Sequence, residues 1–137
     1  AHAGWRGLAA GVLEATIEAL PVAADSVHVW LGPGIGPRAF EVGEDVRNAF
    51  LACQGPSADA CFLRSKSIPR AITGDTTFLC NLYGLARQRL VAAGVAQITG
   101  GEYCTFEDRE SFFSYRRDGQ TGRMATIAYL TSASSTR

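Results

Sequence analysis

The chain has 137 residues, which suits one domain with a buried core. Its 13 basic and 13 acidic residues give a formal net charge of zero, so the composition offers no electrostatic attraction for nucleic acid or for an anionic membrane. No apolar run approaches the roughly 18 residues of a membrane span, and the four cysteines contain no C-x-x-C pair. We therefore expect a cytoplasmic protein with reduced thiols, and small molecules rather than nucleic acids or membranes as its partners.

The first half of the sequence predicts two helices separated by a short strand. Apolar residues recur at helical spacing over residues 6–20, and strand-like alternation covers residues 27–32. His28 falls on the outer face of that strand, so we interpret it as a surface residue. A short extended step at residues 40–42 leads into a second helix, which opens at Gly43 with two acidic residues that suit the helix dipole.

The middle of the sequence has fewer regular signals. We expect a loop over residues 54–60, a short strand over residues 61–63 and a mobile, turn-rich segment over residues 68–77. Asn81 can cap a third helix that runs to residue 93, and the glycine after it provides the left-handed residue that commonly ends a helix.

The last part of the sequence predicts three further strands. They cover residues 95–99, 112–115 and 124–130, and the Ser/Thr-rich tail over residues 131–137 is expected to be disordered. A helix followed by a tight glycine turn and a strand is typical of a layered α/β unit. We therefore expect an α/β (α+β) fold, a mixed β-sheet flanked by helices.

Two stretches invite comparison with functional sites. Residues 32–37, with the sequence GPGIGP, follow a strand as a phosphate loop would, but the two prolines remove two amide donors. The segment is then either a rigid loop at the mouth of a pocket or a plain turn. His2 stands two residues before a glycine that permits a sharp corner, and it is either presented there for chemistry or lies at a frayed terminus.

Five motifs carry a resemblance to a known family: HAGWRGL, LGPGIGP, FEVGEDV, the CT pair at Cys104 and Thr105, and FFSYRRDGQTGR. In this order they resemble the C-terminal half of the YfiH, or laccase-domain, family, whose members are described both as polyphenol oxidases and as purine nucleoside phosphorylases with adenosine deaminase activity. The resemblance implies that residues 1–130 form the C-terminal portion of a single YfiH-like domain. Its fold is shared with the catalytic domain of cytotoxic necrotizing factors, and the N-terminal half of the domain is expected upstream.

The resemblance also implies a zinc site. The family binds zinc through two histidines and a cysteine, and His2 matches the second histidine, whereas the other two ligands would lie before Ala1 in a TADC-type motif. A self-contained site that joins His2 to Cys104 is an alternative that the spacing does not support. We therefore expect the 137-residue chain alone to bind zinc weakly or not at all.

For the substrate, the resemblance places the loop after the first strand near the active site. Aromatic rings are candidates to stack on a purine, with core positions as the alternative, and arginines are candidates to hold phosphate. The alternative for the arginines is a solvated edge paired with Asp118. Because they follow a predicted strand, one arginine should face the pocket and its neighbour should point away. The candidate substrate-binding residues are Gly34, Ile35, Gly36, Phe40, Phe113 and Tyr115, and the candidate catalytic residues are Arg116 and Arg117.

We consider three functions, of which the resemblance implies the first two. The first is a zinc-dependent purine nucleoside phosphorylase that acts on adenosine, inosine or methylthioadenosine, has adenosine deaminase activity and uses phosphate as its second substrate. The second is a copper-dependent polyphenol oxidase of the laccase type, although two histidines, His2 and His28, are too few for a multicopper cluster. The third is a structural half with no activity of its own.

Overall fold

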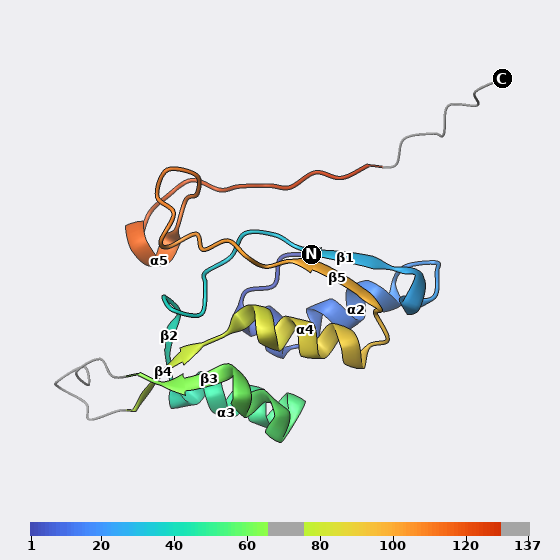
Figure 1. Cartoon of the computed structure of the whole chain (residues 1–137), viewed down its shortest axis with the longest axis horizontal. Helices are drawn as coiled ribbons and strands as arrows, with labels where there is room; N and C mark the ends of the chain where they lie inside the picture. Colours follow the sequence, from blue (N-terminus) through green and yellow to red (C-terminus); the bar gives the residue numbers. More distant parts are fainter. Residues whose placement is uncertain (66–75, 130–137) are drawn as a thin grey trace.

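The computed structural model describes residues 1–65 and 76–129, and within them parallel and antiparallel strands are flanked by helices (Figure 1). The expected α/β (α+β) fold is confirmed, with the strands arranged in two separate sheets. The predicted disordered tail lies outside the described residues, and so does most of the segment predicted to be mobile. None of the helices in the described ranges combines the length and the apolar character needed to cross a membrane.

The parallel sheet joins two strands that are far apart in the sequence. β1 (His28–Leu31) pairs with β5 (Gln97–Gly100). Alternate residues of β1 turn inward, and His28 on the outer face lies within hydrogen-bond distance of Thr99 on the neighbouring strand, at 3.0 Å. The surface position predicted for His28 is confirmed.

Two helices stand where the sequence predicts one over residues 6–20. α1 (Trp5–Ala9) and α2 (Val12–Glu18) are separated because Gly11 has a backbone φ of 89°, a left-handed conformation that breaks the helical path. The prediction of one continuous helix is wrong, since the apolar spacing continues across the break. The short 3₁₀ helix η1 (Ala24–Ser26) then leads from α2 to β1.

The antiparallel sheet has three strands among the described residues. β4 (Thr77–Cys80) lies in the middle, between β2 (Glu41–Gly43) and β3 (Phe62–Arg64). β4 is not predicted from the sequence, because a strand of this length depends on its two partners rather than on local propensity. The loop expected over residues 54–60 is also a correction, since the 3₁₀ helix η2 (Pro56–Cys61) occupies most of it.

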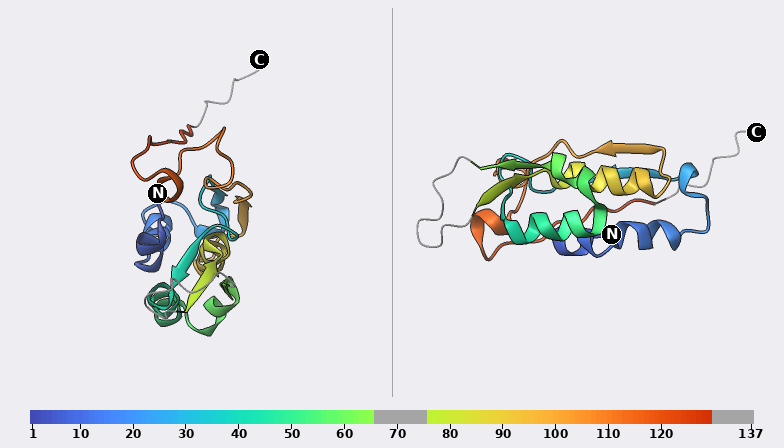
Figure 2. Two further views of the ribbon diagram at one scale, coloured as in Figure 1. Left: turned by 90° about the vertical axis from the view of Figure 1, so that its left-hand side faces the viewer. Right: turned by 90° about the horizontal axis from the view of Figure 1, so that it is seen from below.

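The two longest helices agree with their predictions. α3 (Glu44–Gln54) begins after its glycine, and α4 (Leu82–Ala92) begins after Asn81, whose Oδ1 accepts a hydrogen bond from Gly84 N–H at 2.9 Å. Gly94 has a φ of 88° and ends α4 as expected. α4 packs against α2, and α3 packs against α1. These four helices lie on one side of the β1–β5 pair (Figure 1 and Figure 2).

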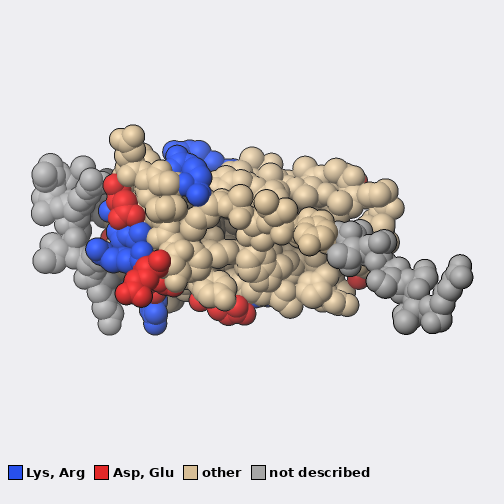
Figure 3. Space-filling model, turned by 90° about the horizontal axis from the view of Figure 1, so that it is seen from above, with Lys and Arg blue, Asp and Glu red and all other residues tan. Residues whose placement is uncertain are grey.

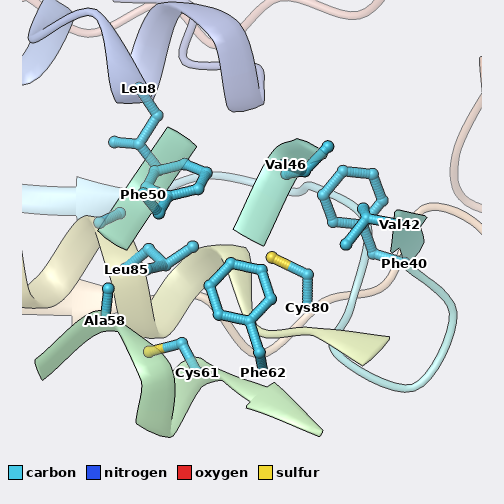
Figure 4. Close-up of a cluster of buried hydrophobic side chains, with 11 residues drawn as sticks. Leu8, Phe40, Val42, Val46, Phe50, Ala58, Cys61, Phe62, Cys80 and Leu85 are labelled. Atoms are coloured by element: carbon cyan, nitrogen blue, oxygen red, sulfur yellow. The ribbon is translucent and has the colours of Figure 1, made fainter. Parts of the chain in front are cut away.

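Two clusters of buried side chains form the core. The smaller one packs α2 and α4 against β1 and β5 through Ile17, Leu90 and Val95. The larger one lies between α1, α3, α4 and the antiparallel sheet (Figure 4). Burying one large apolar side chain stabilises a fold by about 1.5–3 kcal/mol, so this cluster holds the scaffold together. Its residues are Leu8, Phe40, Val42, Val46, Phe50, Ala58, Cys61, Phe62, Cys80, Leu85 and Ala86.

The C-terminal part of the described chain contains no strand, which corrects two predictions. Residues 112–115 lead into α5 (Tyr115–Asp118) because Ser114 caps that helix, and its Oγ accepts a hydrogen bond from Arg117 N–H at 3.4 Å. The last predicted strand has no strand partner among the described residues, and residues 119–129 run along the outside of the molecule (Figure 1). Strand-like composition does not produce a strand without a partner.

Candidate functional site

The glycine loop, residues 34–36, is joined to the segment that contains Cys104 and Thr105. Gly34 accepts a hydrogen bond from Thr105 N–H at 2.9 Å and pairs with Cys104 in an isolated parallel bridge. Gly36 N–H donates to Cys104 Sγ at 3.2 Å, and a Cβ at Gly36 would lie only 3.0 Å from the Cβ of Cys104. A glycine therefore suits this close approach of the two segments.

Tyr83, in the first turn of α4, holds the same loop through its hydroxyl group. The oxygen accepts a hydrogen bond from Gly34 N–H at 2.5 Å, and its proton faces the carbonyl oxygens of Tyr103 and Gly32 at 3.0 and 3.2 Å. Burial raises the pKa of Tyr83. Ile35, the middle residue of the loop, packs against the larger core cluster. Tyr83 is not among the candidate residues predicted from the sequence, because helical spacing marks only the apolar positions of α4.

Arg117 uses all five of its N–H groups inside the structure. Nη1 donates to the carbonyl oxygens of Thr105 and Phe106 at 2.8 and 3.1 Å, and Nη2 donates to that of Phe112 at 2.9 Å. Nε and Nη2 also donate to the Asp118 carboxylate, each at 2.8 Å, and this lowers the pKa of that carboxyl. With 8% of its side chain exposed, Arg117 faces inward and has no donor left for a phosphate.

Arg116 points away from this network and is exposed. Its Nη1 donates to the Glu41 carbonyl oxygen at 2.8 Å, and its guanidinium carbon lies 5.2 Å from the ring centroid of Phe40, a cation–π geometry. The other N–H groups of Arg116 have no partner within the part of the chain that the structure describes. Of the two candidate arginines, Arg116 is the one that can still receive an anion. The two side chains diverge as expected, but they do so on a helix rather than on a strand.

The three candidate aromatic residues have different environments. Phe40 is 5% exposed and belongs to the larger core cluster, so its ring is occupied by packing and by Arg116. Phe113 and Tyr115 are 52% and 74% exposed and flank the residue that caps α5. A Cβ at Gly122 would lie 2.7 Å from the Phe113 ring, so the turn after α5 packs against that ring. Stacking on a purine stays a prediction for the two exposed rings.

A hollow of about 370 Å³ lies beside α5. Its walls come from residues 109–113 and from Arg117, Asp118 and Thr121. Figure 3 shows that most charged side chains on this face of the molecule gather at the end that carries α5. Because Arg117 bonds to Thr105 and Thr105 bonds to Gly34, the hollow and the glycine loop are two linked surfaces of one region.

His2 is exposed, and within the described part of the chain no side-chain hydrogen bond or ion pair joins it to this region. A Cβ at Gly4 would lie 3.4 Å from its Nε2, so the ring turns back toward its own segment. The described residues contain no group of three His, Cys, Asp or Glu side chains that could hold a metal ion, and the Cys104 sulfur accepts from Gly36 instead. By themselves these residues do not fit a zinc or a multicopper centre.

The match to a protein family covers almost the whole chain. A family model described as multi-copper polyphenol oxidoreductase laccase matches residues 1–131. The chain belongs to this family. Membership in the laccase-domain family confirms the resemblance that the five sequence motifs indicate.

Two relatives in the laccase-domain family carry a more specific name. The chain is 53% identical over 130 residues to a purine nucleoside phosphorylase of Pseudomonas aeruginosa. It is 52% identical over 130 residues to the purine nucleoside phosphorylase YfiH of Escherichia coli. Both alignments cover 95% of this chain, but only 50% and 49% of the relatives. The chain therefore spans about half the length of the curated relatives it matches.

Solved structures share the laccase-domain fold of this chain. A Neisseria meningitidis protein of the DUF152 family superposes with a TM-score of 0.78 at 47% identity, covering 87% of this chain and 46% of that protein. The YfiH protein of Bacillus licheniformis gives a TM-score of 0.76 at 29% identity, covering 87% of this chain and 44% of that protein. The YfiH-like fold expected from the motifs is confirmed.

Proposed function

We propose that this chain is the C-terminal part of a purine nucleoside phosphorylase and that Arg116 holds the phosphate. The names of two relatives, at 52% and 53% identity over 95% of this chain, support the reaction class. The observation that carries the residue assignment is the exposed guanidinium of Arg116, anchored through one nitrogen at Glu41 with its other donors open among the described residues. A planar cation held in this way suits a phosphate dianion.

In phosphorolysis a phosphate oxygen forms a bond to C1′ of the ribose while the glycosidic C–N bond breaks. The electron pair of that bond leaves with the purine, which takes up a proton, and positive charge develops at C1′ in the transition state. In the proposal Arg116 orients the phosphate for this attack. The exposed rings of Phe113 and Tyr115 offer an apolar wall to the purine, a face that adenosine, inosine and methylthioadenosine all present.

Arg117 has a different role in the proposal. Its five N–H groups are bonded to three backbone carbonyls and to Asp118, so it holds α5 against the segment that contains Thr105. It therefore positions Arg116, its neighbour on α5, and does not touch the phosphate. Ala and Lys substitutions at the two arginines should have different consequences for this reason.

His2 is the one zinc ligand that we propose in this chain. The described residues hold no group of three possible ligands, so the other two ligands would come from the half of the relatives that this chain does not span. That N-terminal half is the proposed partner of the chain. Adenosine deamination is proposed as a second activity of the completed protein, and a cytoplasmic location, supported by the four free cysteines, belongs to the same proposal.

Copper-dependent oxidation of polyphenols is the second candidate function. The description of the matching family model favours it. A multicopper centre needs many histidine and cysteine ligands, and His28 is occupied with Thr99 on the outer face of β1. The third candidate, a structural half without activity, is favoured by the coverage of about half of each relative. One experiment separates the three.

The experiment uses a chimeric protein in which residues 1–130 of this chain replace the matching half of the Pseudomonas aeruginosa relative. Release of free base from adenosine and inosine is measured with and without phosphate, with the unmodified relative as the control. Base released only with phosphate supports the phosphorylase. No release from the chimera, while the relative is active, contradicts it, and oxygen uptake with a phenol and copper then supports the oxidase. The 137-residue chain, assayed alone, tests whether this half is active by itself.

A further inference from the structure

Tyr83 brings together segments that are distant in the sequence. Its hydroxyl oxygen receives Gly34 N–H at 2.5 Å, from a residue 49 positions earlier in the chain. Its proton faces the carbonyl oxygen of Tyr103 at 3.0 Å, 20 positions later, and that of Gly32 at 3.2 Å. One hydroxyl group thus accepts from the glycine loop and donates to a carbonyl of either segment.

The ring of Tyr83 also fits closely against glycines of both segments. A Cβ at Gly34 would lie 3.2 Å from the hydroxyl oxygen, and one at Gly101 would lie 3.0 Å from ring carbon Cδ1. Gly101 has a φ of 83°, and its N–H donates to the Leu31 carbonyl oxygen at 2.8 Å. Tyr83 is therefore held between the two segments that leave the parallel strands β1 and β5.

This position is the carboxyl end of the parallel strand pair. In open α/β sheets, ligands bind in the crevice outside the carboxyl ends of the strands. The glycine loop follows β1 directly, and the segment of residues 101–105 follows β5. A group that fixes these two segments to each other therefore fixes the walls of the place where a ligand of such a sheet binds.

We propose that the Tyr83 hydroxyl is a positioning group for substrate binding, which fixes the glycine loop against residues 103–105 and so sets the shape of the nucleoside-binding surface at the carboxyl ends of β1 and β5. The identity of the substrate rests on the proposed phosphorylase function. Thr105 donates to Gly34 and accepts from Arg117, so a displacement of the loop reaches α5 through two hydrogen bonds. Tyr83 thus acts through the loop and not by contact with the reacting atoms.

Tyr83→Phe tests this role because it removes the hydroxyl group and keeps the ring. In the 137-residue chain, followed by NMR, we expect the amides of Gly34 and Thr105 to exchange with deuterium about tenfold faster, whereas the amide of Leu85 in α4 keeps its rate. Tyr129→Phe, at a tyrosine that is 82% exposed, is the matched control and leaves all three rates unchanged. An unchanged rate at Gly34 overturns the proposal, and so does equal acceleration at all three amides, which reports a global loss of stability.

The same substitution in the chimera separates positioning from a merely structural contribution. We expect the KM for the nucleoside to rise about tenfold, while the KM for phosphate changes by less than about twofold. An active chimera in which Tyr83→Phe leaves both KM values unchanged overturns the positioning role. A chimera without phosphorylase activity, combined with faster exchange at Gly34, overturns the proposed function and retains the anchoring of the loop by Tyr83.

Discussion

α4 and α5 are held to the rest of the molecule in different ways. α4 has eleven residues, and its buried apolar side chains, Leu85 and Leu90 among them, enter both core clusters. α5 has four residues, none of which enters a core cluster, and it is held by the Ser114 cap and by the hydrogen bonds of Arg117. The region of the candidate site is therefore fixed by directional polar contacts, whereas the scaffold is fixed by burial.

This difference predicts different consequences for substitutions in the two regions. Burial stabilises the folded protein in proportion to the apolar area removed from water, and in the core this stabilisation is distributed over many side chains. The position of α5 depends on a few hydrogen bonds from one side chain, so it can change while the core stays folded. Core substitutions should alter the free energy of unfolding, and substitutions at α5 should alter local order and activity.

The largest effect is expected in the core. Phe50 is fully buried in the larger cluster, so Phe50→Ala should lower the free energy of unfolding by about 4 kcal/mol through lost burial and the cavity left behind. Urea denaturation of the 137-residue chain measures this. Leu63→Ala, at a residue that is 69% exposed, is the control and should cost less than about 0.5 kcal/mol. Equal costs for the two changes would mean that the larger cluster is not the stabilising core.

The next effect is a large loss of activity with little change in stability. In the chimera, Arg116→Ala should lower kcat/KM for phosphate about a hundredfold, because it removes the open cation that holds the anion. The free energy of unfolding should fall by less than about 1 kcal/mol, since Arg116 is exposed and loses one hydrogen bond and one cation–π contact. Arg64→Ala, at an exposed arginine on β3, is the matched control. Comparable losses in both variants would show that general positive charge, rather than Arg116, attracts the phosphate.

A smaller effect is expected at the neighbouring arginine. Arg117→Lys keeps the charge but replaces a planar fork of five donors by three, so the segment bonded to it should open about tenfold more often. Hydrogen exchange of the Asp118 and Gly119 amides measures the opening. Arg116→Lys serves as the control. If it accelerates exchange as much as Arg117→Lys does, Arg117 is not what fixes α5.

The smallest effect concerns pH. The hydrogen bond from Arg117 lowers the pKa of Asp118 in the folded protein, so this pair stabilises α5 fully above the ordinary aspartate pKa of about 3.9. Its contribution is lost as the pH falls through the lower folded pKa. Protection of the Gly119 amide, corrected for intrinsic exchange, should be constant from about pH 7 to pH 5 and should fall below about pH 4. In Asp118→Asn the protection of the Gly119 amide should not change with pH over this range. If the variant keeps the pH dependence of the unmodified chain, the Asp118 carboxyl is not the group that titrates.

Much of the scaffold can be predicted from local sequence. The apolar spacing of α3 and α4, the cap at Asn81 and the left-handed Gly94 act within one or two turns of chain, so they are visible without the rest of the molecule. The break at Gly11 and the strand β4 are not visible in this way. The apolar pattern around Gly11 does not show that its backbone φ is positive. β4 exists because β2 and β3 pair with it.

The sequence by itself determined the family, the principal helices and strand β1, because motifs, caps and apolar periods are local properties. Tertiary structure alone decided the arrangement of the candidate site: that Arg117 is enclosed, that Arg116 is open, and that Tyr83 reaches the glycine loop. Arg116 contacts a carbonyl 75 positions earlier, and Tyr83 contacts an amide 49 positions earlier. Such hydrogen bonds depend on the path of the whole chain, since every backbone segment offers the same donors and acceptors.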